Sequence, residues 1–278
     1  GSFDKDIIPL EDYLGDQRYY LEAFLDRFEG GIEFVGAPHR WVIEANWKLP
    51  MENQLGDVNH GPFLHAAVIP PEANQEIIDY GLSAVTEAGH GATFRLMPEN
   101  APIDDVAWGM EAPGSILGGP EVHDYLRATQ AKAEERVGAL RARMKGLTYG
   151  VYPNLSFLWS NASFKVSHPR GPGKVEYWSW SVVPADAPQE IKKTLRTNYT
   201  SLFGPGGILE QEDSEVWSQQ FRGSNFDFAD DRPYFYGLGL NEERPHPDLP
   251  GMVDVTANEH YARAFFSRWR DALLAVEK

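Results

Sequence analysis

Two histidines and an aspartate lie within the thirteen residues from Asn53 to His65. The segment contains no Lys or Arg, so no local positive charge opposes a bound cation. Imidazole and carboxylate groups are common ligands of divalent transition metals. The residue types therefore predict a metal site that includes His60 and His65, with the Asp57 carboxylate close by.

The spacing of the two histidines requires a distorted backbone. On a regular helix, residues five apart point roughly 140° away from each other. Gly61-Pro62 lies between them, and a proline inside a helix kinks it. We therefore expect a kinked helix that turns both imidazoles toward one cation. Two histidines at this spacing are also compatible with unrelated surface or core positions.

Two histidines are too few for a stable site, and the best source of a further ligand lies far downstream. The segment 203–215 ends in four acids, Glu210, Glu212, Asp213 and Glu215. The simpler interpretation is a solvated helix start, with Asp213 or Ser214 as its cap. Combined with the histidines, one carboxylate would complete a 2-His-1-carboxylate triad, which leaves open positions on non-haem Fe(II).

These segments together resemble a known family. The chain contains Asn46-Trp47-Lys48, then Glu52-Asn53, then Gly56-Asp57-x2-His60-x4-His65, and finally Phe203-Gly204-Pro205-x-Gly207 followed by Glu212-Asp213. In this order they resemble the catalytic domain of the large (α) subunit of Rieske-type aromatic-ring-hydroxylating dioxygenases. The resemblance covers nearly the whole chain.

The resemblance implies a function and assigns roles. It implies that His60, His65 and Asp213 bind a mononuclear Fe(II) and that Asp57 passes electrons to this centre. The expected reaction is O₂-dependent hydroxylation of an aromatic ring, with cis-dihydroxylation as the expected form. Asn59 departs from the family, in which Tyr is common at this position, and the departure concerns packing around the ligands.

Six further positions match substrate-pocket positions of the family: Asn53, Gln54, Val58, Leu158, Phe203 and Leu209. Their side chains are all uncharged. This favours a neutral aromatic hydrocarbon as substrate, because a carboxylated ring would require an Arg partner. Arg95 is distant in sequence, and the fold could still bring it into the pocket.

The family resemblance also implies partners. Related proteins receive electrons from NAD(P)H through a reductase and a ferredoxin, and they form α3 or α3β3 oligomers with a small β subunit. Their Rieske [2Fe–2S] cluster occupies an N-terminal domain and needs two cysteines, whereas this chain has none. Because Gly1-Ser2 is typical of a tag scar and Pro9–Asp16 resembles the segment that comes after the Rieske domain in relatives, we expect 1–278 to be a single catalytic domain without it.

Composition excludes several other classes of partner. The net charge of −16 disfavours binding to nucleic acid or to an anionic membrane, since both are polyanions. No apolar run is long enough for a membrane span, and no signal peptide is visible. We therefore expect a soluble protein, and the resemblance implies a cytoplasmic location of bacterial type.

Long antiparallel strands, a helical insertion and a long C-terminal helix together predict an α+β fold. The resemblance implies that the antiparallel sheet has a helix-grip (Bet v 1-like) architecture. The expected helices cover 10–28, 125–145, a segment from a cap at Asp186 to Phe203, and a terminal helix opened by a capping box at 256–259. The expected strands are 32–36, 41–49, 92–96, 151–166 and 175–183. In the terminal helix, Phe265, Phe266, Trp269 and Leu273 are expected to face the core.

Other segments carry weaker expectations. Residues 76–120 are expected to be a loop-rich insertion, which caps the active site in the family, and 225–255 an extended surface segment. His90 and His123 are expected to be surface residues.

Two other functions remain compatible with the residues. A His₂-Asp site with water also suits a zinc hydrolase, although the chain lacks a general-base motif such as H-E-x-x-H. A sheet gripped by a helix could also bind apolar molecules without catalysis. Metal analysis, and substitution of the three ligand residues, distinguish these alternatives from an iron oxygenase.

Overall fold

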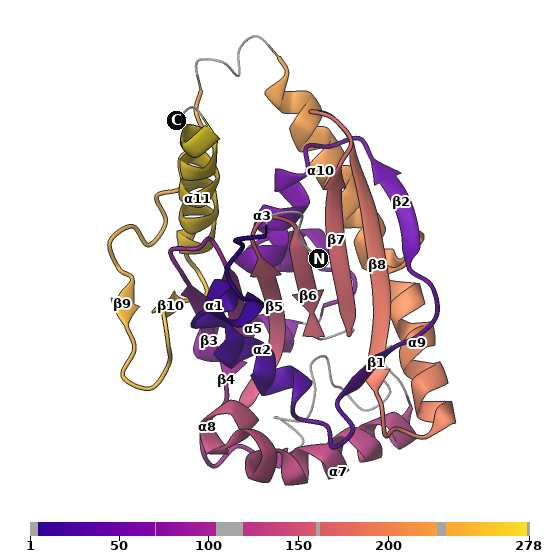
Figure 1. Cartoon of the computed structure of the whole chain (residues 1–278). Helices are drawn as coiled ribbons and strands as arrows, with labels where there is room; N and C mark the ends of the chain where they lie inside the picture. The colour runs from indigo at the N-terminus through magenta and orange to yellow at the C-terminus, as the bar shows by residue number, and fades with distance from the viewer. Residues whose placement is uncertain (1–4, 70, 104–118, 160–161, 227–231, 277–278) are drawn as a thin grey trace.

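The computed structural model describes residues 5–69, 71–103, 119–159, 162–226 and 232–276 (Figure 1). Its ten strands form one antiparallel sheet in the order β1-β8-β7-β6-β5-β4-β3-β10-β9, with β2 also paired to β8. The strands are β1 Ile32–Phe34, β2 His39–Ile43, β3 Gly81–Val85, β4 Gly91–Leu96, β5 Met144–Val151, β6 Leu155–Leu158, β7 Ser163–Pro169, β8 Val175–Pro184, β9 Arg244–Pro245 and β10 Met252–Val255.

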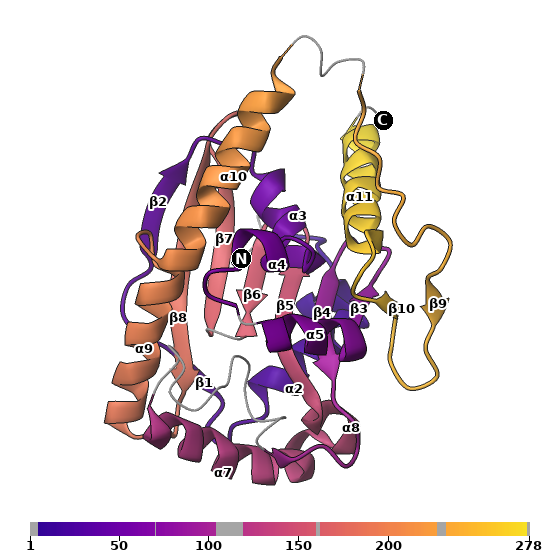
Figure 2. The same cartoon turned by 180° about the vertical axis from the view of Figure 1, so that it is seen from behind.

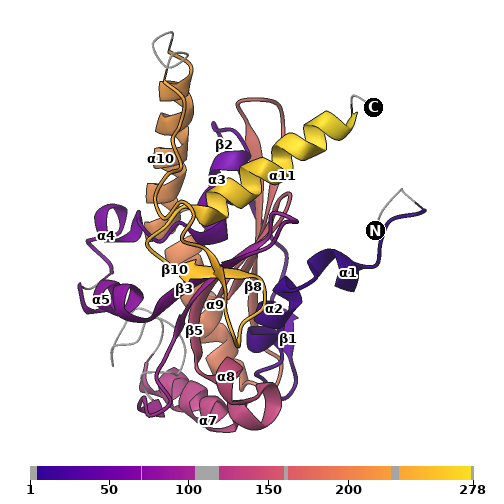
Figure 3. The same ribbon diagram turned by 90° about the vertical axis from the view of Figure 1, so that its left-hand side faces the viewer.

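Helices cover both faces of this sheet. Figures 2 and 3 show α3, α4, α5 and α10 on one side and α1 and α2 on the other. The helices are α1 Leu10–Leu14, α2 Gln17–Leu25, α3 Lys48–Gly56, α4 Gly61–Leu64, α5 Pro71–Tyr80, α7 Pro120–Val137, α8 Ala139–Ala142, α9 Gln189–Phe203, α10 Ile208–Ser224 and α11 His260–Val276. The predicted α+β class, antiparallel sheet and long C-terminal helix are confirmed. Across the described ranges, no helix combines the length and apolar character needed to cross a bilayer.

The aromatic core lies between α2 and the sheet. Phe24 and Phe28 pack on Trp159, with ring centroids 4.8 and 5.5 Å apart, and Tyr20 packs on Phe94 at 5.2 Å. Fully burying such rings contributes about 1.5–3 kcal/mol each. The expected single helix over 10–28 is two helices, because Gly15 adopts a positive φ of 49° and turns the chain between them.

Helix α3 packs closely against the opposite face. The Leu55 side chain lies over two glycines of the sheet, and a Cβ on Gly150 would be only 2.6 Å from Leu55 Cδ2. Glycine therefore allows α3 to approach β5. The predicted strand 41–49 is too long, since β2 ends at Ile43 and α3 begins at Lys48. The Asn46 side chain accepts a hydrogen bond from the Lys48 N–H at 3.1 Å, which favours the turn into the helix.

The central hairpins differ in part from expectation. The predicted turn at 169–174 joins β7 and β8, and Pro169 pairs with Val175. By contrast, 151–166 is not one strand, because turns after Val151 and Leu158 divide it among β5, β6 and β7. The predicted helix 125–145 also ends early, since Gly138 adopts φ 81° and Lys145 already belongs to β5.

The C-terminal helix α11 packs against α3 and β3. Phe265 is fully buried, whereas Leu273 is 51% exposed, so the prediction that Leu273 faces the core was wrong. The capping box does not form either. The Thr256 hydroxyl donates to the Ile77 carbonyl, and the His260 N–H donates to Asn258 Oδ1 at 2.9 Å. The Thr256 hydroxyl, which the capping box would require, is thus engaged in a tertiary contact with α5 instead.

Other local expectations also change. His90 is fully buried, because its Nε2 lies 2.9 Å from the Tyr13 carbonyl oxygen and its Nδ1 accepts the Tyr152 N–H at 3.0 Å. His123 is half-buried on α7. Asp186 does not cap α9, which begins after Pro188, and instead accepts a hydrogen bond from the Tyr125 hydroxyl.

Two expected loop regions contribute elements of the sheet. The segment 76–120 contains the second half of α5 and strands β3 and β4, and its residues 104–118 lie outside the described ranges. The segment 225–255 contains β10, which pairs with β3. Both regions therefore form part of the antiparallel sheet.

Candidate metal centre

Asp57 ends α3 and organises the turn after it. Its backbone is extended, with φ −72° and ψ 95°, so the helix cannot continue. Its Oδ1 accepts hydrogen bonds from the Asn59 N–H at 2.9 Å and the His60 N–H at 3.3 Å. Such an Asx turn is a local alternative to helical hydrogen bonding, and it redirects the chain toward α4.

His60 and His65 flank the single turn of α4. His60 precedes this turn and His65 comes after it, and the two imidazole centroids lie 5.1 Å apart. The expected kink inside one helix is wrong. The chain breaks between α3 and α4, and Pro62 occupies the first turn of α4, where its missing N–H has little effect.

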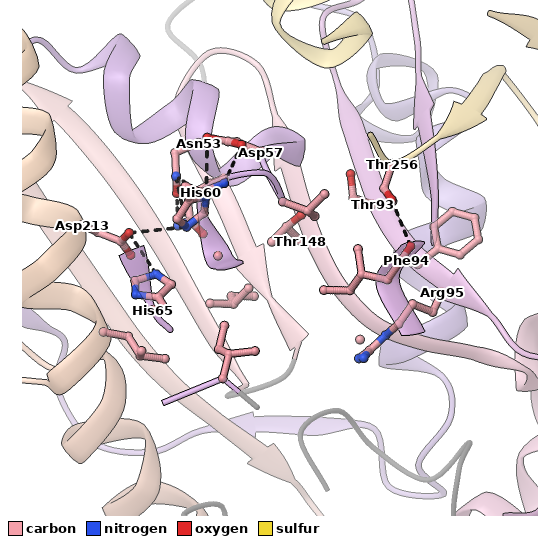
Figure 4. A pocket seen from close by; sticks show the side chains of 18 of the residues that line it. Asn53, Asp57, His60, His65, Thr93, Phe94, Arg95, Thr148, Asp213 and Thr256 are labelled. Atoms are coloured by element: carbon pink, nitrogen blue, oxygen red, sulfur yellow. Dashed lines mark hydrogen bonds and ion pairs between the residues drawn. The ribbon is translucent and has the colours of Figure 1, made fainter. Parts of the chain in front are cut away.

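Asp213 approaches the histidines from α10. A tight turn precedes this helix, and a Cβ on Gly207 would lie 2.5 Å from the Leu202 carbonyl oxygen. Because α10 begins at Ile208, Asp213 is inside the helix and is not its cap. Its Oδ1 lies 3.2 Å from His65 Nε2 and 3.6 Å from His60 Nε2. Figure 4 shows the Asp213 side chain facing both imidazoles.

This geometry suits one divalent ion. His60, His65 and Asp213 each offer a ligand atom, and these atoms lie within 4.8 Å of one another. Nitrogen and oxygen ligands at about 2.1 Å from a metal, placed at right angles, are about 3 Å apart. Asp213 Oδ1 is buried and accepts no hydrogen bond from the described part of the chain. A cation at this point would provide the partner that a buried carboxylate oxygen needs.

Carboxylates also orient the far side of each imidazole. His65 Nδ1 lies 2.8 Å from Glu212 Oε2, so its Nε2 faces Asp213. His60 Nδ1 lies 3.5 Å from Asp57 Oδ2 and 3.2 Å from Asn53 Nδ2. Metal-binding histidines usually have such a carboxylate partner on the second nitrogen. The sequence pattern did not identify Glu212 in this role.

The surrounding acids favour positive charge at the centre. Burial lowers the pKa of His60, but the hydrogen bond to Asp57 and the charges of Asp57 and Asp213 outweigh it, so the pKa is raised. For His65, burial is likewise outweighed by Asp213 and Glu212, and the pKa is again raised. The same field would attract a metal cation.

The remaining acids of α10 point elsewhere. Glu210 is fully buried and forms an ion pair with Lys165, with 2.6 Å between its Oε2 and the lysine Nζ. Glu215 is exposed and accepts a hydrogen bond from Gln219. Glu212 is the acid beside Asp213 that contacts a histidine.

A cavity of about 170 Å³ opens beside the three residues. It is lined by all six predicted pocket positions, Asn53, Gln54, Val58, Leu158, Phe203 and Leu209. Residues that the sequence pattern did not assign also line it, including Thr93, Thr148, Thr256 and Arg95. These residues come from strands β4 and β5 and the segment before α11, so no local motif could place them at the cavity.

Comparison with known proteins supplies the family. Residues 10–275 match the family described as ring hydroxylating alpha subunit (catalytic domain). The chain belongs to this family. It is 34% identical to the biphenyl dioxygenase subunit alpha of Paraburkholderia xenovorans (strain LB400), over 96% of this chain and 59% of that protein. It is 30% identical to the benzene 1,2-dioxygenase subunit alpha of Pseudomonas putida, over 96% of this chain and 60% of the relative.

A solved structure supports the fold of this ring-hydroxylating family member. A variant of naphthalene 1,2-dioxygenase bound to phenanthrene superposes with a TM-score of 0.83 at 29% identity, covering 97% of this chain and 61% of the other. The chain therefore spans about three fifths of the length of these relatives.

Proposed function

We propose that this chain hydroxylates an aromatic ring with O₂, with cis-dihydroxylation as the expected outcome, at a mononuclear Fe(II) bound by His60, His65 and Asp213. The convergence of these three side chains beside a largely apolar cavity supports the proposal, and membership in the ring-hydroxylating family supports the reaction. When bound, the iron would supply the open coordination positions at which O₂ is activated.

The other residues would position the substrate and exclude water. Leu158, Phe203 and Leu209 are buried beside the metal-binding residues and would hold the ring against them. Asn53 and Gln54 would provide polar contacts at the end of α3. A largely apolar wall keeps bulk water from the reacting atoms, which strengthens electrostatic interactions inside the site.

The test is product analysis with iron-loaded enzyme. Full-length protein with its reductase and ferredoxin should convert at least one member of a panel of aromatic compounds to a hydroxylated product, with both oxygen atoms of a diol derived from ¹⁸O₂. Metal analysis should give about one iron per chain. Zinc without iron, together with hydrolysis of an ester or amide, would instead support a zinc hydrolase.

We also propose the setting in which the chain acts. It would be the single catalytic domain of an α subunit whose Rieske [2Fe–2S] domain supplies electrons, with a ferredoxin and an NAD(P)H-dependent reductase upstream. The assembly would be α3 or α3β3, in the cytoplasm of a bacterium. Relatives named as dioxygenase α subunits support these assignments.

Asp57→Asn in the full-length protein should retain most of the iron and lose nearly all turnover. Asp57 touches His60 and lines both the substrate cavity and a second hollow that contains Glu52 and Tyr236. This position supports the proposed role of Asp57 in passing electrons to the metal centre. Iron content and steady-state product formation should be measured together.

The matched control for Asp57→Asn is Glu215→Gln, which removes one negative charge from an exposed position of α10. It should leave iron content and turnover unchanged. Loss of iron in step with activity would make Asp57 a structural residue, and normal turnover in Asp57→Asn would remove it from the electron path.

The 278-residue chain alone should show no sustained turnover with reductase, ferredoxin and NADH. It contains no cysteine, and a Rieske cluster requires two. Product formation from an aromatic substrate is the measurement, and full-length protein is the positive control. Multiple turnovers by the isolated chain would show that electrons reach the site without this cluster.

A further inference from the structure

A charged residue lies in the wall of the otherwise largely apolar cavity. Arg95 on β4 is only 9% exposed and lines the cavity. Figure 4 shows it across the cavity from His60, His65 and Asp213. We propose that Arg95 binds an oxygen substituent of the aromatic substrate, at the end of the molecule away from the metal-binding residues.

A β-bulge places the guanidinium in the wall. Between β4 and β5, Phe94 pairs with Leu147 and Arg95 pairs with Lys145, so Gly146 has no partner of its own. Gly146 adopts φ +50°, and a Cβ there would overlap Arg95 Nη2. Bulges with a glycine at positive φ redirect neighbouring side chains, and here the glycine leaves space for the guanidinium.

An ion-pair network fixes the guanidinium in this position. Arg95 Nη1 lies 2.6 Å from Glu76 Oε2, and Lys145 Nζ lies 3.1 Å from Glu76 Oε1. Glu76 belongs to α5, so the network connects this helix to β4 and β5. Removing two cations from water is unfavourable unless they have partners, and Glu76 supplies one to each.

The chemistry of the Arg95 guanidinium indicates which substituents of a substrate it would bind. A guanidinium has five N–H donors in a planar fork, so contacts within the protein, of which Glu76 is one, do not preclude contact with a substrate oxygen. Its bonds to carboxylate oxygens are charge-assisted and stronger than neutral ones. The expectation of a hydrocarbon substrate was based on six uncharged positions of the cavity wall. Arg95 adds a cation to the same wall, which favours a substrate that carries an oxygen substituent.

The size of the cavity suits a ligand with a single ring. Apolar cavities of roughly 150 Å³ can hold benzene, and this cavity is of similar volume at about 170 Å³. One ring with a small oxygen substituent therefore fits the space. This inference rests on the proposed function, because it takes this cavity as the ring-binding site.

Equilibrium binding to the iron-free chain tests the inference without turnover. Toluene, benzyl alcohol and benzoate have similar size and differ in the oxygen atoms they present. By ligand-observed NMR, benzoate and benzyl alcohol should bind at least about tenfold more tightly than toluene, which corresponds to one hydrogen bond to a charged group. Equal or tighter binding of toluene would overturn the proposal.

Variants then assign the preference to Arg95. Arg95→Met should remove the tenfold preference and leave toluene binding within about twofold, and Arg95→Lys should retain part of it. Arg143→Met is the matched control, because Arg143 is a nearby arginine that hydrogen-bonds the Met97 carbonyl outside the cavity lining. An unchanged preference in both Arg95 variants would overturn the proposal. Should Arg95→Met not fold, by circular dichroism, the comparison of Arg95→Lys with wild type decides.

The outcomes separate this inference from the proposed function. Ligand selectivity is measured without metal, whereas the function requires iron and product. Failure to bind iron, with the oxygen preference intact, would contradict the function alone. Normal hydroxylation without an Arg95-dependent preference would contradict this inference alone.

Discussion

Replacing His60, His65 or Asp213 by Ala is expected to lower bound iron from about one per chain to less than about a tenth. Each substitution leaves only two of the three converging ligand atoms, and a triad that lacks one member retains little chelation. The measurement is metal analysis of each purified variant after anaerobic loading with Fe(II) and desalting. Thermal unfolding checks that each variant is folded.

Two controls locate the third ligand. Glu215→Ala changes an exposed acid of the same helix and should keep full iron. Glu212→Gln should weaken binding without abolishing it, because Glu212 contacts the Nδ1 atom of His65, on the opposite side of the ring from Asp213. Full iron in Asp213→Ala would move the third ligand, and Glu212 would be the first residue to test.

Lys165→Met is expected to lower the free energy of unfolding by about 3–5 kcal/mol, because removing one partner of a buried ion pair leaves the other charge uncompensated. Lys165 and Glu210 have no exposed side-chain surface and lie 2.6 Å apart. The Lys165 Nζ also lies 4.7 Å from the centroid of the Phe203 ring. The substitution therefore removes both the ion pair and a contact with an aromatic ring of the cavity wall.

The pH dependence of this loss provides a second readout. Burial raises the pKa of Glu210 to about 7, although Lys165 opposes the shift. Without the lysine the carboxyl would favour its neutral form further. A carboxyl whose pKa is raised in the folded state makes the protein less stable as the pH rises from the ordinary carboxyl pKa to the raised value. Because this raised value is higher in Lys165→Met than in wild type, the variant should lose more stability at pH 8 than at pH 6.

Denaturant unfolding, with the exposed Lys193→Met as control, measures these differences. The double variant Lys165→Met/Glu210→Leu should recover most of the loss, since apolar replacement of both partners is often nearly neutral. A loss below about 1 kcal/mol would show that this pair does not stabilise the fold.

Local sequence determined which residues are the candidate metal ligands. The spacing of Asp57, His60 and His65, with the acidic segment at Asp213, was sufficient to nominate a metal site, because ligand types and short motifs are local properties. The β7–β8 hairpin was also predictable, since its turn at 169–174 contains Gly171 and Gly173 between two alternating strands. The antiparallel strands and the C-terminal helix were expected from the pattern of elements, and the resemblance added only the helix-grip arrangement.

Local periodicity was less reliable at element boundaries. The strand predicted through Leu49 ends at Ile43, and the helix predicted through Lys145 ends at Val137. The alternation of apolar and polar side chains that predicted the strand continues beyond Ile43, although the backbone has already left the strand there. Gly138 at positive φ decides the second boundary.

Only the tertiary structure decided how the site is built. His60 and His65 face each other because α3 ends at Asp57 and α4 is a separate turn, and packing of Leu55 against the sheet fixes that break in space. Glu212 contacts His65 although the two residues are 147 positions apart in the sequence. Arg95 enters the cavity through a bulge at Gly146, which depends on the register between two strands. Such long-range contacts have no local signature, because they arise only when distant segments pack together.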